Sequence, residues 1–262
     1  MDHWKMFAFF FVGSFFKDIR AINIKDVRIP KVVKEGTEEP IILDCNYDMG
    51  TSSNTGLTIK WYIGPELLYQ WVQGSPPRAS DEFHKYVDVS YKASNNSNTM
   101  YRAVKLVRPG LELSGNYRCV VFTHDDEVEA EERMVVYSPE NYFTVHQDHK
   151  STGASKSELI VTCLAKGLSP LPTITLRQDK EEIFQQTAIV PRPDGRYEVK
   201  SIAIMDAKRL RPPVTFKCEV HIEDANYTNF KEVVYSGSDA PLPRTFVLAV
   251  IFVVSIFIAG NQ

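Results

Sequence analysis

The sequence contains none of the short motifs that mark common catalytic loops. Gly-x-Ser-x-Gly, His-Glu-x-x-His and the phosphate-binding loop Gly-x-x-x-x-Gly-Lys-Ser/Thr are all absent from its 262 residues. The six histidines are scattered, and the pair His146 and His149 lacks the further cysteine or carboxylate, at ligand spacing, that a metal site needs. We therefore expect no catalytic residue, no metal site and no cofactor, in a chain that is not an enzyme.

A large excess of basic residues is also missing. The chain has 30 lysines and arginines against 33 aspartates and glutamates, which gives a net charge of −3. Nucleic-acid-binding proteins present strongly basic faces with interleaved aromatic residues, and this sequence has no such stretch. We expect neither a nucleic acid nor a small-molecule substrate as partner, so the remaining class of function is binding through a protein surface.

Cysteines are few, and they divide into two widely spaced pairs. Seventy-four residues separate Cys45 from Cys119, and fifty-five separate Cys163 from Cys218. Four cysteines allow three connectivities. Only the pairing 45–119 and 163–218 repeats one architecture, so we predict these two disulfides. Such bridges need an oxidising compartment, and each stabilises its domain by roughly 4 kcal/mol on the loop-entropy account.

The residues around the first cysteine pair have the pattern of an immunoglobulin sandwich. The segment IILDCNY predicts a strand that contains Cys45, and LTIKWYIG places Trp61 in a second strand. The segment SGNYRCVVF sets Tyr117 two residues before Cys119. In that fold the disulfide joins two sheets, the tryptophan packs on it, and the tyrosine hydroxyl bonds back to the preceding corner. We therefore predict that Trp61 and Tyr117 are core residues.

The spacing between the cysteines predicts two different domains. The additional length of the first lies after Trp61, where variable-type domains carry the strands C′ and C″. In the shorter, constant-like second domain, Leu176 takes the place of the tryptophan and Phe216 that of the tyrosine. The predicted fold is all-β, with two tandem immunoglobulin-like β-sandwiches, each with one inter-sheet disulfide. The variable-type domain covers residues 22–138 and the constant-like domain residues 139–235.

The N-terminus predicts a secretory signal peptide. An apolar run, MFAFFFVGSFF, follows Lys5 and has the length of a signal-peptide core, which is too short for a membrane-spanning helix. We expect the signal peptide to cover residues 1–21, with cleavage after Ser14 or after Ala21.

The C-terminus predicts a membrane anchor. A second apolar run, residues 246–259, ends three residues before the last one without a basic flank, and it follows the small residues Ser236, Gly237 and Ser238 and a short spacer. This pattern favours a GPI-attachment signal over residues 236–262 with attachment at Ser236, and a single-pass helix is the alternative. Either anchor places the folded part on the extracellular side of the plasma membrane, and a secreted form stays open.

The candidate binding site is a sheet surface. On a variable-type sandwich the sheet of strands G, F, C and C′ is the usual contact face, and aromatic residues supply much of the binding energy at interfaces. Tyr69 and Trp71 lie on one face of strand C′, although the sequence does not fix whether that face is outward. An acidic hairpin follows strand F over residues 124–132, and it either steers a basic partner or is a solvated turn. The predicted partner-binding residues are Tyr62, Tyr69, Trp71 and Phe122.

Two glycosylation sequons lie in stretches that are rich in polar residues. Asn95 begins Asn95-Asn96-Ser97, and Asn226 begins Asn226-Tyr227-Thr228. In a secreted chain such sequons mark exposed loops, so we predict glycosylation at Asn95 and Asn226.

The first domain resembles that of the Beaten path family of insect neuronal proteins. The resemblance rests on VRIP near the start, LDCNYDM around Cys45, IKWYIGPELLYQW around Trp61 and SGNYRC before strand G, and covers about residues 24–137. It implies a cell-surface or secreted protein with two immunoglobulin-like domains. It also implies heterophilic binding of a Sidestep-like partner, itself a cell-surface immunoglobulin-superfamily protein, through the first domain, in axon guidance or synaptic recognition. Homophilic adhesion or immune-type recognition is the alternative.

Overall fold

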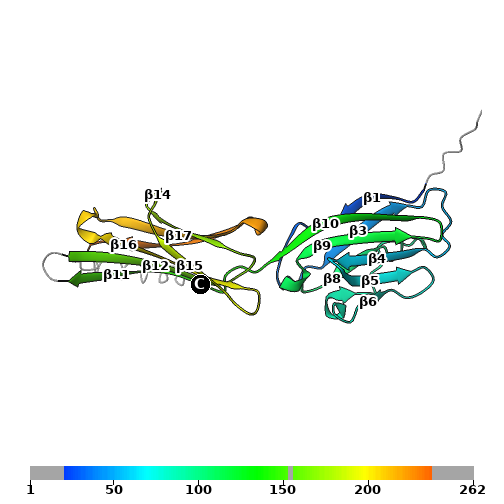
Figure 1. The fold of residues 1–262 in the computed structure, drawn as a ribbon, viewed down its shortest axis with the longest axis horizontal. Coiled ribbons are helices and arrows are strands. Elements are labelled where there is room, and N and C mark those ends of the chain that lie inside the picture. Colours follow the sequence, from blue (N-terminus) through cyan, green and yellow to red (C-terminus); the bar gives the residue numbers. More distant parts are fainter. Residues whose placement is uncertain (1–20, 153–155, 238–262) are drawn as a thin grey trace, which may run out of the picture. The chain divides into compact units, whose positions relative to one another are not determined.

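Strands in which apolar residues alternate with polar ones form two β-sandwiches. Each sandwich contains one of the two cysteine pairs. The computed structural model describes residues 21–152 and 156–237. The chain divides after Tyr137 into two compact units (Figure 1). Each unit has two sheets and one disulfide. The predicted all-β fold of two tandem immunoglobulin-like sandwiches is confirmed. Most of the predicted signal peptide and the apolar C-terminal run lie outside the described residues, and no helix within those residues is long and apolar enough to cross a membrane.

Unit 1 consists of a four-stranded and a six-stranded sheet. The first has the order β1 (Asn23–Arg28), β3 (Ile41–Asp48), β8 (Ala103–Leu106) and β7 (Val87–Asp88). The second has the order β2 (Val32–Lys34), β10 (Glu127–Tyr137), β9 (Gly115–Phe122), β4 (Thr58–Ile63), β5 (Glu66–Val72) and β6 (Arg78–Ala79). Short 3-10 helices lie at His84–Tyr86 and Leu111–Leu113. The strands β5 and β6 correspond to C′ and C″ of a variable-type domain.

The core of unit 1 forms around the disulfide between Cys45 and Cys119. Along β3 every second residue is buried, which directs Cys45 toward the other sheet. Trp61 lies opposite Cys119 on the neighbouring strand β4 and is completely buried. The Tyr117 hydroxyl donates a hydrogen bond to the Leu113 carbonyl at 2.7 Å, which closes the corner before β9. The tryptophan and the tyrosine therefore have the core positions that the sandwich needs.

Unit 2 repeats the arrangement with two four-stranded sheets. One has the order β11 (Tyr142–Thr152), β12 (Lys156–Leu168), β16 (Tyr197–Asp206) and β15 (Gln186–Pro191). The other has the order β14 (Glu181–Glu182), β13 (Thr173–Gln178), β17 (Val214–Ile222) and β18 (Tyr227–Tyr235). The 3-10 helices are Ala207–Arg209 and Glu223–Ala225. Leu176 lies opposite Cys218, as Trp61 lies opposite Cys119, and both Leu176 and Phe216 are completely buried.

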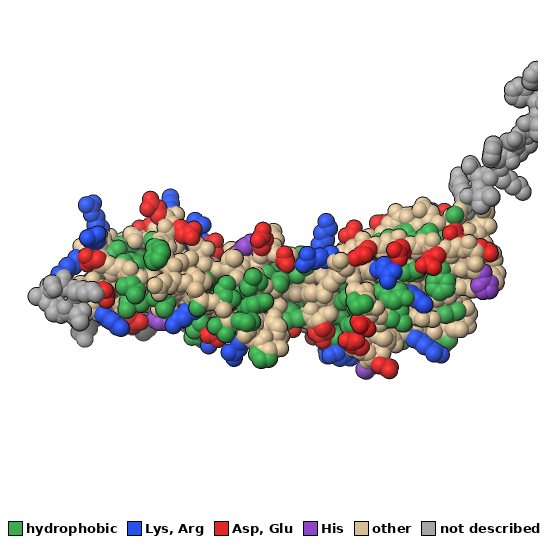
Figure 2. Space-filling model, viewed as in Figure 1, with side chains coloured by type: hydrophobic (Ala, Val, Ile, Leu, Met, Phe, Trp, Pro, Cys, Tyr) green, Lys and Arg blue, Asp and Glu red, His purple; other side chains and the backbone are tan. Residues whose placement is uncertain are grey.

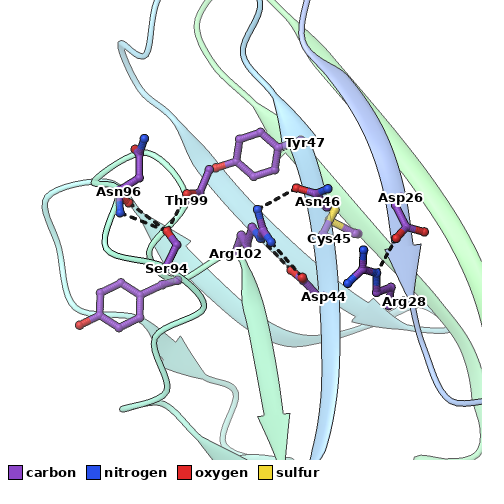
Figure 3. Close-up of polar contacts among 12 residues, drawn as sticks. Asp26, Arg28, Asp44, Cys45, Asn46, Tyr47, Ser94, Asn96, Thr99 and Arg102 are labelled. Carbon is purple, nitrogen blue, oxygen red and sulfur yellow. Dashed lines mark hydrogen bonds and ion pairs between the residues drawn. A yellow bond between two sulfur atoms is a disulfide. The ribbon is translucent and has the colours of Figure 1, made fainter.

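A polar network joins the strands of the four-stranded sheet of unit 1. Figure 3 shows Arg102, just before β8, beside Asp44 and Asn46 on β3. Its guanidinium donates to both carboxylate oxygens of Asp44 at 2.8 and 3.0 Å, and to the Asn46 side chain at 2.8 Å. Two parallel hydrogen bonds between a guanidinium and a carboxylate fix orientation as well as distance. The network therefore holds the start of β8 against β3.

Asp88 and Lys105 form a second ion pair on this sheet, across β7 and β8. The Asp88 carboxylate accepts from the Ser90 hydroxyl at 2.6 Å, from the Ser90 N–H at 3.0 Å and from Lys105 at 2.9 Å. These bonds, from Ser90 first and Lys105 next, lower the pKa of Asp88 to about 2. The folded-state pKa is below the unfolded value of about 4, so the carboxylate stabilises the fold above that value, and this contribution is lost as the pH falls through the folded pKa.

Replacing Trp61 by Ala should lower the free energy of unfolding of unit 1 by about 3–5 kcal/mol, because it opens a large cavity beside the disulfide. Denaturant unfolding of residues 21–237 measures the loss. The variant Leu176→Ala should affect the transition of unit 2 instead. A loss of under about 1 kcal/mol for Trp61→Ala would contradict its place at the centre of the core.

The variant Asp88→Asn should be less stable than the wild type at neutral pH. The difference should shrink as the pH is lowered from about 4 toward about 2, because the wild-type carboxylate then becomes protonated too. Denaturant unfolding at a series of pH values gives the two curves. A difference that stays constant over this range would show that the charge of Asp88 does not contribute.

Candidate protein-binding face

The aromatic residues of β5 lie in the core of unit 1 and not on its surface. Tyr69 is 2% exposed and Trp71 is 3% exposed. Residues directly opposite on paired strands share a face, and Tyr69 lies opposite the buried Trp61. The prediction that Tyr69 and Trp71 contact a partner is therefore wrong in its premise, because neither ring is available at the surface.

The polar atoms of the buried Trp61 and Tyr69 have hydrogen-bond partners within unit 1. The Trp61 indole N–H donates to the Arg102 carbonyl at 3.1 Å, and the Tyr69 hydroxyl donates to the Tyr101 carbonyl at 3.0 Å. The Trp71 ring packs edge-on against Tyr101, with 5.6 Å between ring centres. Burial raises the pKa of the Tyr69 hydroxyl, so it remains a donor at any physiological pH. Aromatic rings enter a core at little cost when their polar atoms find such partners.

Asn98 connects three loops at this end of unit 1. Its backbone carbonyl accepts a hydrogen bond from the Tyr47 hydroxyl, and its side-chain oxygen accepts from Gln73 and, at 3.2 Å, from Asn54. The loop before β4, the turn after β5 and the segment before β8 therefore meet at one amide. Sequence analysis did not identify Asn98, because an asparagine in a polar stretch gives no signal of its distant partners.

Tyr62 and Phe122, the other two predicted residues, lie on the outward face of the six-stranded sheet. Each ring is partly exposed and lies beside a cation. The Arg118 guanidinium is 4.7 Å from the Tyr62 ring centre, and the Lys60 ammonium is 5.2 Å from the Phe122 ring centre. Such cation–π pairs contribute about 0.5–1 kcal/mol at exposed sites and hold a ring in one orientation. The two pairs form a fixed aromatic and cationic surface on neighbouring strands.

An acidic row borders this surface on β10. The register places Glu127 opposite Phe122, Glu129 opposite Val120 and Glu131 opposite Arg118, so all three glutamates point outward with the rings. Arg118 also donates to Glu129 at 2.8 Å. Acidic side chains on unit 1 are visible in Figure 2. Of the residues in the predicted acidic hairpin, Asp126 has a structural role, because its carboxylate accepts from the Ile22 N–H at 2.8 Å.

A hollow of about 450 Å³ lies at the other border, between β5 and β6. Gln70 and Val72, two of its lining residues, lie opposite Lys60 and Thr58 on β4, so the hollow continues the same outward face. We call this surface the C–F face, defined by Lys60, Tyr62, Gln70, Val72, Arg118 and Phe122. It combines rings, cations and a depression lined by both apolar and polar residues, which suits the docking of a protein surface. The other residues that line the hollow are Leu67, Ser75, Pro76, Arg78, Ala79 and Ser80.

The described residues contain no cluster of three His, Cys, Asp or Glu side chains that could hold a metal ion, and no free cysteine. Asn95 and Asn226 are both exposed, and neither lies on the C–F face. Asn95 lies in the segment between β7 and β8, where Figure 3 shows the neighbouring Ser94, Asn96 and Thr99 bonded to one another. Glycosylation of the two asparagines stays a prediction.

Comparison with known proteins gives the fold. No protein-family model and no curated protein matches the chain. Bovine butyrophilin has a similar structure, with a TM-score of 0.61 at 16% identity over 79% of this chain and 95% of that one. The ectodomain of mouse nectin-like molecule 4 gives a TM-score of 0.53 at 15% identity over 79% and 65% of the two chains. A chain from the structure of ICOS in complex with ICOS-L and an anti-ICOS-L VNAR domain gives 0.52 at 13% identity over 78% and 98%. At such identities the likeness shows two immunoglobulin-like domains.

Replacing Tyr69 by Phe should lower the stability of unit 1 by about 1 kcal/mol, because the Tyr101 carbonyl loses its donor while the ring stays in place. Hydrogen exchange of the amides in residues 98–102 should become faster. Tyr62→Phe is the matched control, since this ring lies on the outward face, and it should leave both quantities nearly unchanged. Equal effects of the two variants would contradict the anchoring role of Tyr69.

Proposed function

We propose that the protein is an extracellular recognition protein that binds another cell-surface protein through the C–F face of unit 1. The observation that carries this proposal is the pair of outward rings, Tyr62 and Phe122, each beside a cation on the six-stranded sheet of unit 1. The two disulfides support an extracellular location, because such bonds persist in oxidising compartments.

The composition of the C–F face supports protein binding in particular. Tyrosine and arginine are enriched among the residues that dominate binding energy at interfaces. Because Arg118 contacts both the Tyr62 ring and Glu129, these side chains have little freedom left to lose when a partner binds. The glutamates of β10 add a negative border, which favours association with a partner that is basic at the corresponding place.

The resemblance to the Beaten path family suggests the class of partner. We propose heterophilic binding of a Sidestep-like immunoglobulin-superfamily protein, in axon guidance or synaptic recognition. Two residues of the quoted motifs have structural roles here, since Asn46 accepts from Arg102 and the Tyr47 hydroxyl bonds Asn98. The two residues therefore support a variable-type domain like that of the Beaten path family. We expect the C–F face to determine which partner this domain binds.

The C-terminal segment suggests that the protein is anchored on the outer side of the plasma membrane. Ser236 is exposed and directly follows β18, where a chain leaving the second sandwich is accessible for modification. Attachment of a glycolipid at Ser236 would hold both units on the outer side of the plasma membrane. Release of the protein from cells by a phospholipase that cleaves such anchors tests this directly, whereas a single-pass helix would keep it in the membrane.

A binding screen tests the proposed function. Residues 21–237 are presented to a panel of cell-surface immunoglobulin ectodomains that includes Sidestep-family members and the protein itself. Tyr62→Ala and Phe122→Ala should each weaken binding of the partner by about 2 kcal/mol or more. Phe230→Ala in unit 2 is the matched control, because this ring is 51% exposed and also has a lysine, Lys217, at 4.1 Å.

The outcomes of the screen separate the alternatives. Binding of a Sidestep-like partner that is lost in the two unit 1 variants supports heterophilic recognition. Binding of the protein only to itself, lost in the same variants, would indicate homophilic adhesion instead. A partner whose affinity is unchanged by both variants would remove the C–F face from the interface.

A further inference from the structure

The packing of unit 1 begins directly after one of the two candidate cleavage sites. Ile22 is 3% exposed and belongs to the hydrophobic core, whereas Ala21, the residue before it, is exposed. Strand β1 then begins at Asn23, which lies opposite Asp48 on β3. Among the residues that the structure describes, Ile22 is therefore the first that contributes to the core.

The backbone nitrogen of Ile22 contacts a carboxylate that is distant in the sequence. Its N–H donates to Asp126 Oδ2 at 2.8 Å, across a sequence separation of 104 residues. Asp126 lies in the turn between β9 and β10, directly before Glu127, the first residue of β10. The hydrogen bond therefore ties the start of the domain to this turn.

Asp126 also holds the turn in shape. Its Oδ1 accepts from the Glu127 N–H at 3.0 Å, and its backbone carbonyl accepts from the Thr123 N–H at 2.8 Å. Phe122 and Glu127, on either side of the turn, lie opposite each other on β9 and β10. The carboxylate thus connects the start of unit 1 with the end of the hairpin that carries the Phe122 ring.

The partners of the Asp126 carboxylate are backbone N–H groups and not cations. Both of its oxygens accept such bonds, and the residue is partly buried. Within residues 21–152 and 156–237, no lysine, arginine or histidine forms an ion pair with it. A carboxylate that is partly withdrawn from water is stabilised by a nearby positive charge. The Ile22 nitrogen is the place for such a charge, because it already lies at hydrogen-bond distance.

We infer that the mature chain begins at Ile22 and that its α-ammonium group forms an ion pair with Asp126. A signal peptidase hydrolyses the Ala21–Ile22 amide with one water molecule. The C–N bond breaks, the water oxygen goes to the Ala21 carbonyl carbon and its two protons go to the Ile22 nitrogen, which gives a carboxylate and an ammonium. An α-amino group has an ordinary pKa of about 8, so it is mostly charged at neutral pH. Charge-assisted hydrogen bonds are roughly twice as strong as neutral ones, so cleavage strengthens the contact that fixes the turn.

Cleavage at the other candidate site would not create this ion pair. A cut after Ser14 leaves residues 15–21 attached, and the Ile22 nitrogen then remains a neutral amide with a single hydrogen. The two sites therefore differ in whether Asp126 receives a positive partner. The inference does not depend on the proposed function, because it concerns the processing and the stability of unit 1.

Identification of the mature N-terminus tests the first half of the inference. The full 262-residue chain is expressed in secreting animal cells, its free α-amine is labelled, and the N-terminal peptide is sequenced by mass spectrometry. The first residue should be Ile22. A mature chain that begins at Phe15, or at any residue other than Ile22, would overturn the inference.

Selective acetylation of the α-amine of this mature chain tests the ion pair. Acetylation removes the charge of the N-terminus but leaves an N–H that can still donate to Asp126. Hydrogen exchange of the amides in residues 123–127 should become about threefold to fivefold faster, as for the loss of a partly exposed ion pair. Exchange in β17 of unit 2 should not change.

Two variants show whether the effect of acetylation acts through Asp126. In Asp126→Asn acetylation should cause no further acceleration, because the carboxylate charge is already gone. Asp125→Asn is the matched control, since this residue lies in the same turn and is exposed, and it should respond to acetylation as the wild type does. Circular dichroism checks that each protein is folded. Unchanged exchange in the acetylated wild type, or an equal acceleration in folded Asp126→Asn, would overturn the inference.

Discussion

The arrangement of unit 1 depends on the need of buried aromatic residues for hydrogen-bond partners. Leaving an indole N–H or a phenol hydroxyl unpaired in a core costs about 1–3 kcal/mol. Trp61, Tyr69 and Tyr47 avoid this cost by donating to the carbonyls of residues 102, 101 and 98. The same bonds fix the segment before β8 and fix which side of β5 faces the core. The outward side of β5 is then left to Gln70 and Val72, which line the hollow between β5 and β6.

The sequence was sufficient to predict the fold and part of the candidate site. The disulfides, Trp61 and Tyr117 follow from fixed separations along one chain, and Leu176 follows from the equivalent position in unit 2. The sequence does not show which side chains of β5 face the core. The pairing of β4 and β5 shifts between Trp61 and Tyr62, and this shift leaves Leu68 as an extra residue. A bulge of this kind reverses which side chains face the core.

The two units differ in the surfaces that they leave for partners. Unit 1 presents rings beside cations with an acidic border, which favours a selective partner with matching charges. Unit 2 carries exposed apolar residues on both of its sheets, Ile204 on one and Phe230 and Val234 on the other.

The most direct measurement of the central claim is hydrogen exchange of residues 21–237 alone and bound to a partner captured from the panel of cell-surface immunoglobulin ectodomains. Recognition through the C–F face predicts slower exchange in β4, β9 and the first half of β10, with no change in β1 and β3 on the opposite sheet of unit 1. Protection that is confined to β1 and β3, or to unit 2, would contradict the claim and place the recognition surface elsewhere.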